Sequence, residues 1–261
     1  MIDLHNHILP DCDDGAKTFE ESIEMLRLAE KQGVTDVVNT IHYQHPKMID
    51  RDTSYEHVFS VKQKLQDQLI EQKIKVNIHL GAEVFFDFNL LDILNNELTT
   101  FCNNNYMLIE FQTFMFPPGY QEHLYELSSL GITPIIAHPE RYRPIQNDIQ
   151  IVENLINSGC LMQIDAGSII GHFGEKTKNT SIDMLKNRMV HIMGSDAHNN
   201  RKRNFCLPEA ILKTKKIIGD DVDVLVNQNP MNVLTGKKII APEVEIIGKN
   251  KKNKKWHNFF R

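Results

Sequence analysis

Imidazole and carboxylate side chains recur along this chain of 261 residues, each directly after a short apolar run. Carboxylates and imidazoles together suit divalent Mn, Fe or Zn, and an excess of oxygen donors favours the harder ions. Buried together without a cation, such groups would stay desolvated at a cost of several kcal/mol. The pattern therefore predicts a metal centre. Its candidate ligands are His5, His7, His42, Glu83, Glu110, His138, Asp196 and His198, to which the loop after His7 adds Asp11, Asp13 and Asp14.

Two pairs of these residues are separated by a single position, His5 with His7 and Asp196 with His198. Residues i and i+2 of a strand face the same side. Each pair is therefore predicted to supply two ligands that point inward. A set of about nine ligands exceeds the four to six that one transition ion binds. We expect two or three ions that share a carboxylate.

Three aspartates, Asp11, Asp13 and Asp14, follow the first pair and precede Gly15. This segment reads either as a ligand-bearing loop or as a simple turn. Asp165 is similarly open, because a carboxylate after a strand either binds metal or caps the next segment. His45 is either a proton donor near the site or an ordinary loop residue.

Two arginines lie close to candidate ligands in the sequence: Arg141 follows His138 by three residues, and Arg203 follows His198 by five. A planar guanidinium binds phosphate or carboxylate oxygens bidentately. We therefore expect an anionic substrate, with Arg141 and Arg203 as catalytic residues. Nearby charges and the remaining internal histidines are interpreted as structural or solvated groups, namely Arg201, Lys202, His57, His79, His123, His172 and His191.

The elements that must position these residues alternate between strand-like and helix-like segments. Such alternation predicts a parallel sheet with crossover helices, and the length fits a closed or nearly closed α/β barrel. Functional side chains of such barrels lie at the carboxyl ends of the strands. Strands are predicted at 2–5, 34–41, 74–84, 106–110, 132–137, 160–165 and 190–194. Helices are predicted from Thr18 to Gly33 and at 55–71, 121–130, 149–157, 181–187, 207–218 and 230–234.

Composition excludes several classes of protein. A hydrophobic fraction of 41% and a charged fraction of 24% are typical of a globular chain and not of a disordered one. No apolar run approaches the ~18 residues of a membrane-spanning helix. The start of the chain lacks the features of a signal peptide, and the four cysteines form no close pair. These features together predict a cytoplasmic protein with free thiols.

The net charge of −5 conceals an uneven distribution, because residues 249–261 carry six Lys or Arg and no acidic residue. The preceding 248 residues are therefore more acidic, which argues against a nucleic-acid partner. The basic segment also contains Trp256, Phe259 and Phe260. Basic and aromatic residues together favour a weak contact with an anionic membrane surface or an acidic partner. A solvated end is the alternative.

The order of these motifs resembles that of the PHP (polymerase and histidinol phosphatase) superfamily over nearly the whole chain. More narrowly, the opening segment 3–10 with Asp13-Asp14-Gly15 resembles the PHP-type protein tyrosine phosphatases encoded in capsule and exopolysaccharide loci of Gram-positive bacteria. Segments 81–83, 138–142 and 194–198 carry the same resemblance. One departure is segment 40–43, Thr-Ile-His-Tyr, where many relatives have Thr-Pro-His-His.

The resemblance implies a distorted (β/α)7 barrel over residues 1–248, a separate tail at 249–261, and two to three divalent ions, with Mn²⁺ first and Fe or Zn as alternatives. It implies a phosphatase that acts on the phosphotyrosine cluster in the tail of a membrane-associated bacterial tyrosine kinase and regulates capsule synthesis. The oligomeric state is left open. The implied ligand sets are His5, His7, Glu83 and Asp196 for one ion; Glu83, Glu110 and His138 for a second; and Asp14, His42 and His198 for a third.

Three alternatives stay open at this point. A small-molecule phosphatase of histidinol-phosphate type would use the same scaffold. A metal-dependent amidohydrolase would also begin with H-x-H, although it typically carries a modified lysine on strand four, where this chain has Glu110. A non-catalytic kinase-binding adaptor would keep the metal cluster only as a structural element.

Overall fold

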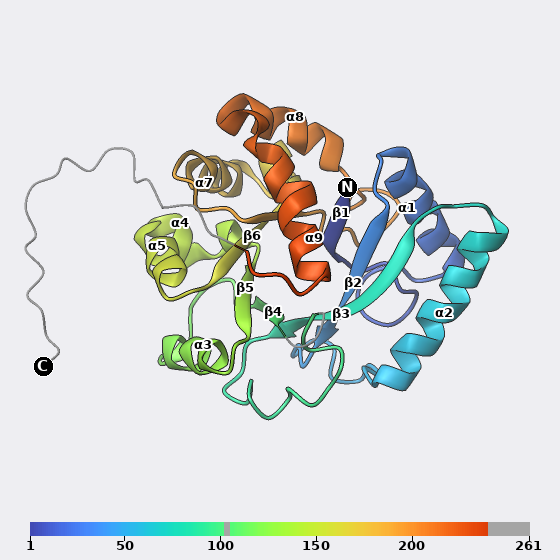
Figure 1. The fold of residues 1–261 in the computed structure, drawn as a ribbon, viewed down its shortest axis with the longest axis horizontal. Helices are drawn as coiled ribbons and strands as arrows, with labels where there is room; N and C mark the ends of the chain where they lie inside the picture. The colour runs from blue at the N-terminus through green and yellow to red at the C-terminus, as the bar shows by residue number, and fades with distance from the viewer. Residues whose placement is uncertain (102–104, 240–261) are drawn as a thin grey trace, which may run out of the picture.

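Seven parallel strands form one sheet in which each strand pairs with its neighbour along the chain (Figure 1). The computed structural model describes residues 1–101 and 105–239. The α/β barrel expected from the alternating segments is confirmed. Its strands are β1 (Ile2–Asn6), β2 (Asp36–Tyr43), β3 (Asn77–Phe85), β4 (Tyr106–Glu110), β5 (Thr133–Ala137), β6 (Leu161–Asp165) and β7 (Ile192–Gly194).

The barrel closes where the segment after β7 meets β1. Asp196 N donates to His5 O at 2.8 Å, and His7 N donates to Ala197 O at 2.8 Å. Just below, the fully buried Asp3 carboxylate accepts hydrogen bonds from the backbone N and the hydroxyl of Ser195, at 3.0 and 2.5 Å. Closure therefore depends on polar contacts that also fix the backbone of three candidate ligands, His5, His7 and Asp196.

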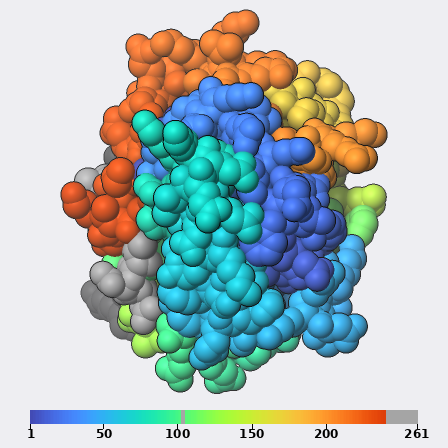
Figure 2. Space-filling view, turned by 90° about the vertical axis from the view of Figure 1, so that its right-hand side faces the viewer, coloured from blue at the N-terminus to red at the C-terminus, as the bar shows by residue number. Residues whose placement is uncertain are grey.

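Helices surround the sheet, and in the described residues the β3–β4 connection is built from turns without a helix. The side formed by α1 and α2 consists mainly of the first part of the chain, coloured blue to cyan in Figure 2. The helix bounds are α1 (Phe19–Lys31), α2 (Tyr55–Glu71), α3 (Tyr120–Ser129), η1 (Pro139–Arg141), α4 (Arg143–Asn147), α5 (Gln150–Asn157), α6 (Ala166–Ile170), α7 (Glu175–Lys186), α8 (Leu207–Ile218), η2 (Gly219–Asp221), the π-helix η3 (Val224–Gln228) and α9 (Asn229–Leu234).

The barrel interior is apolar at its amino-terminal end and polar at its carboxyl end. Val233 of α9 and Ile239 join the interior cluster and cover the amino-terminal end, where α9 lies across the strands (Figure 1). The polar functional groups are thus confined to the opposite end. The buried interior side chains are Ile2, Leu4, Val38, Phe101, Tyr106, Leu108, Ile135, Ala137, Leu161, Ile192, Val233 and Ile239.

Several predicted bounds are wrong. Helix α7 begins at Glu175 and not at residue 181, because its first two turns, Glu-Lys-Thr-Lys-Asn-Thr, contain no large apolar residue that would reveal a helical period. Helices α4 and α6 are five residues each, too short for periodicity to predict. Strand β3 begins at Asn77, three residues later than the apolar alternation suggests.

Among the described residues, no helix has the length and apolarity needed to cross a membrane. The basic segment at 249–261 and the proposed domain limit at residue 248 lie outside the described residues.

Candidate metal centre and anion pocket

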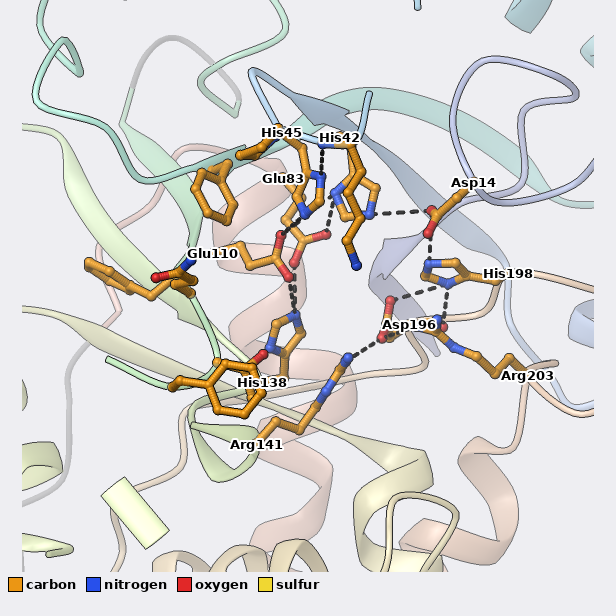
Figure 3. A pocket seen from close by; sticks show the side chains of 17 residues that line it. Asp14, His42, His45, Glu83, Glu110, His138, Arg141, Asp196, His198 and Arg203 are labelled. Atoms are coloured by element: carbon orange, nitrogen blue, oxygen red, sulfur yellow. Dashed lines mark hydrogen bonds and ion pairs between the residues drawn. The ribbon is translucent and has the colours of Figure 1, made fainter. Parts of the chain in front are cut away.

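A cavity of ≈ 390 Å³ opens at the carboxyl ends of the strands. Seven of the nine predicted ligands line it, and His5 and His7 are fully buried against Glu83 and Asp196. Figure 3 shows the labelled side chains converging on this cavity, with Glu83, Glu110 and His138 on one side and Asp14, Asp196 and His198 on the other. The structure therefore gathers all nine residues from six strand ends and the loop after β1.

The imidazoles of His5, in β1, and His7, just after β1, face one another through their Nε2 atoms, which lie 3.4 Å apart. His5 Nδ1 donates to Gln163 Oε1 at 2.8 Å, because the amide Nε2 of Gln163 is itself directed to Ile164 O. His7 Nδ1 donates to Asp13 Oδ2 at 2.7 Å. Each imidazole thus carries a proton on Nδ1 and presents Nε2 to its neighbour, as metal-bound histidines do.

Glu83 and Asp196 complete two triangles of donor atoms with these imidazoles. Glu83 Oε2 lies 3.3 Å from His5 Nε2 and 3.4 Å from His7 Nε2. Asp196 Oδ1 lies 3.4 and 3.5 Å from the same two atoms. Donors bound to one tetrahedral ion at about 2.1 Å lie about 3.4 Å from one another. The residues therefore fit a divalent cation, and they are the set that the sequence resemblance implied for one ion.

Asp14 lies between two further imidazoles. Its Oδ1 is 3.3 Å from His42 Nε2 and 3.3 Å from His198 Nε2, as the dashed lines of Figure 3 mark. His198 Nδ1 donates to Asp196 O at 2.9 Å, which directs its Nε2 lone pair at the Asp14 carboxylate. A lone pair facing a carboxylate at this distance is unfavourable unless a cation lies between them. These three residues match the third implied set, and His7 lies close enough to join it.

A turn positions Asp14. Gly15 follows it, and a Cβ atom at residue 15 would lie 2.0 Å from His7 O, so only glycine permits this approach. Ala16 N donates to the same carbonyl at 3.1 Å, and Gly15 N donates to Asp13 Oδ1 at 2.9 Å. The aspartate segment is therefore a turn, and it places Asp13 and Asp14 beside the candidate ligand histidines.

The buried carboxylate of Glu83 and the partly buried carboxylate of Glu110 both lie near His138. His138 Nε2 lies 2.8 Å from Glu83 Oε1 and 3.7 Å from Glu110 Oε1. Burial and the negative charge of Glu83 raise the pKa of Glu110. Burial also opposes ionisation of Glu83, but His5, His42 and His138 outweigh it and hold the pKa of Glu83 well below its usual range. A cation between two such carboxylates would let both ionise.

Two of the candidate ligands adopt left-handed backbone conformations, His138 with φ 32° and Asp196 with φ 49°. This region is unfavourable for residues other than glycine, at about 1–3 kcal/mol each, and such strain concentrates at functional sites. Because β7 ends at Gly194, Asp196 and His198 are not strand residues. The prediction that strand alternation orients this pair is therefore wrong, although both side chains do reach the site.

Arg141 and Arg203 converge on one oxygen at the edge of the cavity. Arg141 Nη1 lies 2.7 Å and Arg203 Nη2 2.5 Å from Asp196 Oδ2, and Arg141 Nη1 also lies 3.0 Å from Asp165 Oδ2. Burial opposes the charge of Arg141, but Asp165 and Asp196 raise its pKa above the ordinary value. Arg203 Nε has no hydrogen-bond partner among the described residues. Two guanidiniums therefore lie at the edge of a cavity that is lined with carboxylates and imidazoles.

Local turns present both arginines. Arg141 ends the short helix η1, which begins at Pro139 directly after His138. Arg203 ends a loop closed by hydrogen bonds from His198 N and Asn199 N to Arg203 O, at 2.7 and 3.0 Å. The Asn199 carboxamide oxygen accepts from Arg201 N at 3.0 Å, which is an Asx turn, and from Arg203 N at 3.2 Å. These bonds explain the five-residue spacing from His198.

Residues that support the ligands were missed or undervalued in the sequence. Gln163 orients His5, and its position two residues before Asp165 on the same strand face was the available indication. Asp165 binds Arg141 and belongs to none of the candidate metal groups. Glu140 accepts from Asp165 N at 2.9 Å, and burial and the Asp165 charge raise the pKa of Glu140 to about 7. No sequence pattern indicated Glu140.

His45 lines the cavity, and its Nε2 lies 3.7 Å from Glu110 Oε2. Its ring lies against His42 and Phe85, with centroids 4.8 and 5.0 Å away. Burial and the charge of His42 lower the pKa of His45. His45 is therefore not an ordinary loop residue remote from the site: its side chain lies in the cavity, beside the predicted ligands.

Known proteins that resemble this chain identify its family. The family model for capsular polysaccharide synthesis, CpsB/CapC, matches residues 1–235. The chain belongs to the CpsB/CapC family. CapC of Staphylococcus aureus is 33% identical over 258 residues, covering 98% of each chain. Tyrosine-protein phosphatase YwqE of Bacillus subtilis is 32% identical over 253 residues, covering 96% of this chain and 98% of the relative.

A solved structure shares the fold as well as the sequence. It comes from work on YwqE of Bacillus subtilis and CpsB of Streptococcus pneumoniae, described as metal-dependent tyrosine phosphatases. It superimposes with a TM-score of 0.89 at 30% identity, covering 95% of this chain and 100% of that chain. The resemblance to capsule-locus tyrosine phosphatases is therefore confirmed, and this member of the CpsB/CapC family has their barrel.

Proposed function

We propose that this CpsB/CapC-family protein is a metal-dependent protein tyrosine phosphatase. One observation carries the proposal: Arg141 and Arg203 both reach Asp196, whose other carboxylate oxygen belongs to the candidate metal cluster. Cationic side chains that hold phosphoryl oxygens are thereby placed beside the group that would anchor a divalent ion. This juxtaposition suits hydrolysis of a phosphate monoester.

The nine residues gathered at the strand ends would hold the metal as two or three divalent ions. Bound ions supply Lewis acidity and an activated water for attack on phosphorus. The mixture of imidazoles and carboxylates favours Mn²⁺, with Fe and Zn as alternatives. Asp13 and Gln163 hold the imidazoles of His7 and His5 in the tautomer that offers Nε2.

The arginines act on the substrate. In our proposal Arg141 and Arg203 neutralise the phosphoryl oxygens and orient the phosphorus. Most of the barrier reduction arises from this preorganised charge. The leaving group is a phenol with a pKa near 10, so a strong general acid is not essential. His45 is close enough to the cavity to assist the proton transfer.

An apolar part of the cavity wall suits an aromatic substrate. Phe85, Phe111 and Phe114 line it, and Phe114 is 61% exposed with its ring stacked against Arg143, whose Cζ lies 4.5 Å from the centroid. Apolar walls with a few convergent polar groups are typical of small-molecule and side-chain sites. A phosphotyrosine would place its phosphate at the cluster and its ring along this wall.

We further propose that the physiological substrate is the phosphorylated tail of a bacterial tyrosine kinase and that the reaction regulates capsular or extracellular polysaccharide synthesis. Support comes from membership of the capsular polysaccharide synthesis family. In this proposal, the catalytic unit is residues 1–248, the protein is cytoplasmic, and no nucleic acid takes part.

The basic segment 249–261 is proposed to bring the enzyme weakly to the inner face of the membrane, where anionic lipids attract each Lys or Arg by about 1 kcal/mol. Deleting residues 249–261 should leave hydrolysis of a short phosphotyrosine peptide unchanged. It should weaken sedimentation with anionic vesicles, more so at low ionic strength. Equal sedimentation of the full and shortened chains at low salt would contradict the membrane role.

A turnover assay tests the main proposal. Metal-loaded protein is given a phosphotyrosine peptide, histidinol phosphate and a dipeptide in parallel. We expect phosphate release from the peptide to exceed that from histidinol phosphate, with no dipeptide cleavage. Preference for histidinol phosphate would favour the small-molecule phosphatase, and no turnover of any substrate would favour the adaptor.

A further inference from the structure

Phe173 lies behind both arginines of the cavity. Its ring centroid is 4.7 Å from Arg141 Cζ and 5.8 Å from Arg203 Cζ. Both distances fall within the ~6 Å over which a cation is attracted to an aromatic face. The same two guanidiniums share Asp196 Oδ2 on their other side. One ring and one carboxylate thus hold the pair between them.

The turn between α6 and α7 holds this ring in place. Phe173 lies between Gly171 and Gly174, which adopt positive φ values of 98° and 89°. His172 N donates to Gly167 O at 2.9 Å. A Cβ atom at residue 167 would lie 3.0 Å from the Phe173 ring carbon Cε2, so the ring packs directly against the Gly167 backbone. The turn between α6 and α7 therefore fixes where the ring lies.

We propose that Phe173 is a positioning residue for Arg141 and Arg203, an inference that rests on the proposed phosphatase function. Phe173 is not among the residues that line the cavity, so it acts through the arginines. Two guanidiniums that share one carboxylate oxygen repel each other, and the negative face of the ring offsets part of that repulsion. Long arginine side chains also lose rotamer freedom on binding an anion, and the ring restricts that freedom beforehand.

The first test replaces the ring by an aliphatic side chain of similar size. Phe173→Leu should lower kcat/KM for a phosphotyrosine peptide by roughly three- to thirtyfold, the range expected for a lost cation–π contact. It should also weaken binding of inorganic phosphate to the metal-loaded protein, with metal content unchanged. Phe173→Tyr keeps the aromatic face and should restore both values. Phe88→Leu is the matched control, because Phe88 is 52% exposed and does not line the cavity.

A double-mutant cycle shows whether the effect passes through the arginines. In an Arg141→Ala background, Phe173→Leu should weaken phosphate binding much less than it does in the wild type, because the nearer of its two partners is absent. Equal losses in the two backgrounds would overturn the proposal. Loss of bound metal in Phe173→Leu, or unchanged kcat/KM and phosphate affinity, would overturn it as well.

A second variant tests the proposal if Phe173→Leu does not fold. Gly167→Ala keeps the ring but pushes it away from its seat, since the new Cβ would crowd Cε2. It should weaken phosphate binding in the same direction while metal content stays constant, and an unchanged phosphate affinity would count against the proposal. If the wild type does not hydrolyse the peptide, the proposed function fails, and the phosphate affinities still decide the role of Phe173.

Discussion

The Nε2 atoms of His5 and His7 face each other at 3.4 Å inside the barrel, and both side chains are completely buried. Their Nδ1 atoms are already committed as donors to Gln163 and Asp13. Protons on both Nε2 atoms would oppose each other, and so would two lone pairs. A cation that binds both Nε2 atoms removes this repulsion. The same contact then joins the interior of the barrel to the proposed metal centre.

Metal should therefore stabilise the fold. Binding that favours the native state raises the free energy of unfolding by about 4 kcal/mol when the ion is present at a thousand times its Kd. We expect a chelator to lower Tm and remove phosphatase activity together, and His5→Ala to show the low Tm even with metal present. Calorimetric scans with elemental analysis measure both quantities. An unchanged Tm in chelated protein verified to be metal-free would contradict this prediction.

Asp13 should control metal affinity without binding metal itself. Its Oδ2 accepts from His7 Nδ1 at 2.7 Å and from His42 N at 3.2 Å. Loss of a carboxylate that orients a ligand histidine typically costs 10–100-fold in metal affinity, so Asp13→Ala should weaken binding by about that factor. The matched control is Asp11→Ala, since Asp11 is exposed and pairs with Arg51. Titration calorimetry measures both, and equal affinities of the two variants would refute the role of Asp13.

The two arginines should not tolerate lysine. In the proposed function Arg141 and Arg203 hold an anion by their planar guanidiniums, and an ammonium group keeps the charge but loses the fork. Arg141→Lys and Arg203→Lys should each reduce kcat/KM by about tenfold or more, the equivalent of at least one charge-assisted hydrogen bond. Metal content should stay at the wild-type level. Wild-type rates in both variants would contradict a role in substrate binding and would indicate that the two arginines are only structural.

His191 predicts an acid-sensitive contribution to stability. It is fully buried away from the site, its Nδ1 accepts from Met162 N at 3.0 Å, and burial lowers its pKa to about 4. The unfolded chain, with a pKa near 6.5 for histidine, binds a proton that the folded chain refuses between about pH 6.5 and pH 4. The contribution of His191 to the free energy of unfolding is therefore fully present above pH 6.5 and is lost as the pH falls to 4.

The loss attributable to His191 between pH 7 and pH 5 is about 2 kcal/mol. His191→Gln does not titrate and should flatten the pH dependence of the free energy of unfolding by that amount. Urea unfolding at the two pH values, at matched metal concentration, measures the difference. Parallel curves for His191→Gln and the wild type would exclude this contribution.

Much of the site could be predicted because position along a parallel barrel is itself informative. Every strand of such a barrel ends at the same rim, so a carboxylate or imidazole after each apolar run identifies the rim without any contact being known. His42 and Glu110, for instance, lie at the ends of β2 and β4. In the structure His42 Nδ1 lies 3.8 Å from Glu110 Oε2.

The remainder depends on contacts between distant residues, which spacing does not encode. Gln163 meets His5 across 158 positions, and Arg203 meets Phe173 only because the α6–α7 turn returns to the rim. The left-handed backbone of Asp196 likewise broke the alternation assumed for a strand. Such conformations are favoured by tertiary contacts over local preference, so local patterns cannot predict them.

The most direct measurement is phosphate release from a phosphotyrosine peptide by the same preparation before and after metal removal, with metal content determined in each state. We expect hydrolysis with Mn²⁺ bound, none in the chelated protein, recovery when Mn²⁺ is restored, and little at any metal concentration for Glu83→Gln, which alters the carboxylate shared by His5, His7 and His138. Hydrolysis that persists in verified metal-free protein, or its absence from fully loaded protein, would contradict a metal-dependent tyrosine phosphatase at this site.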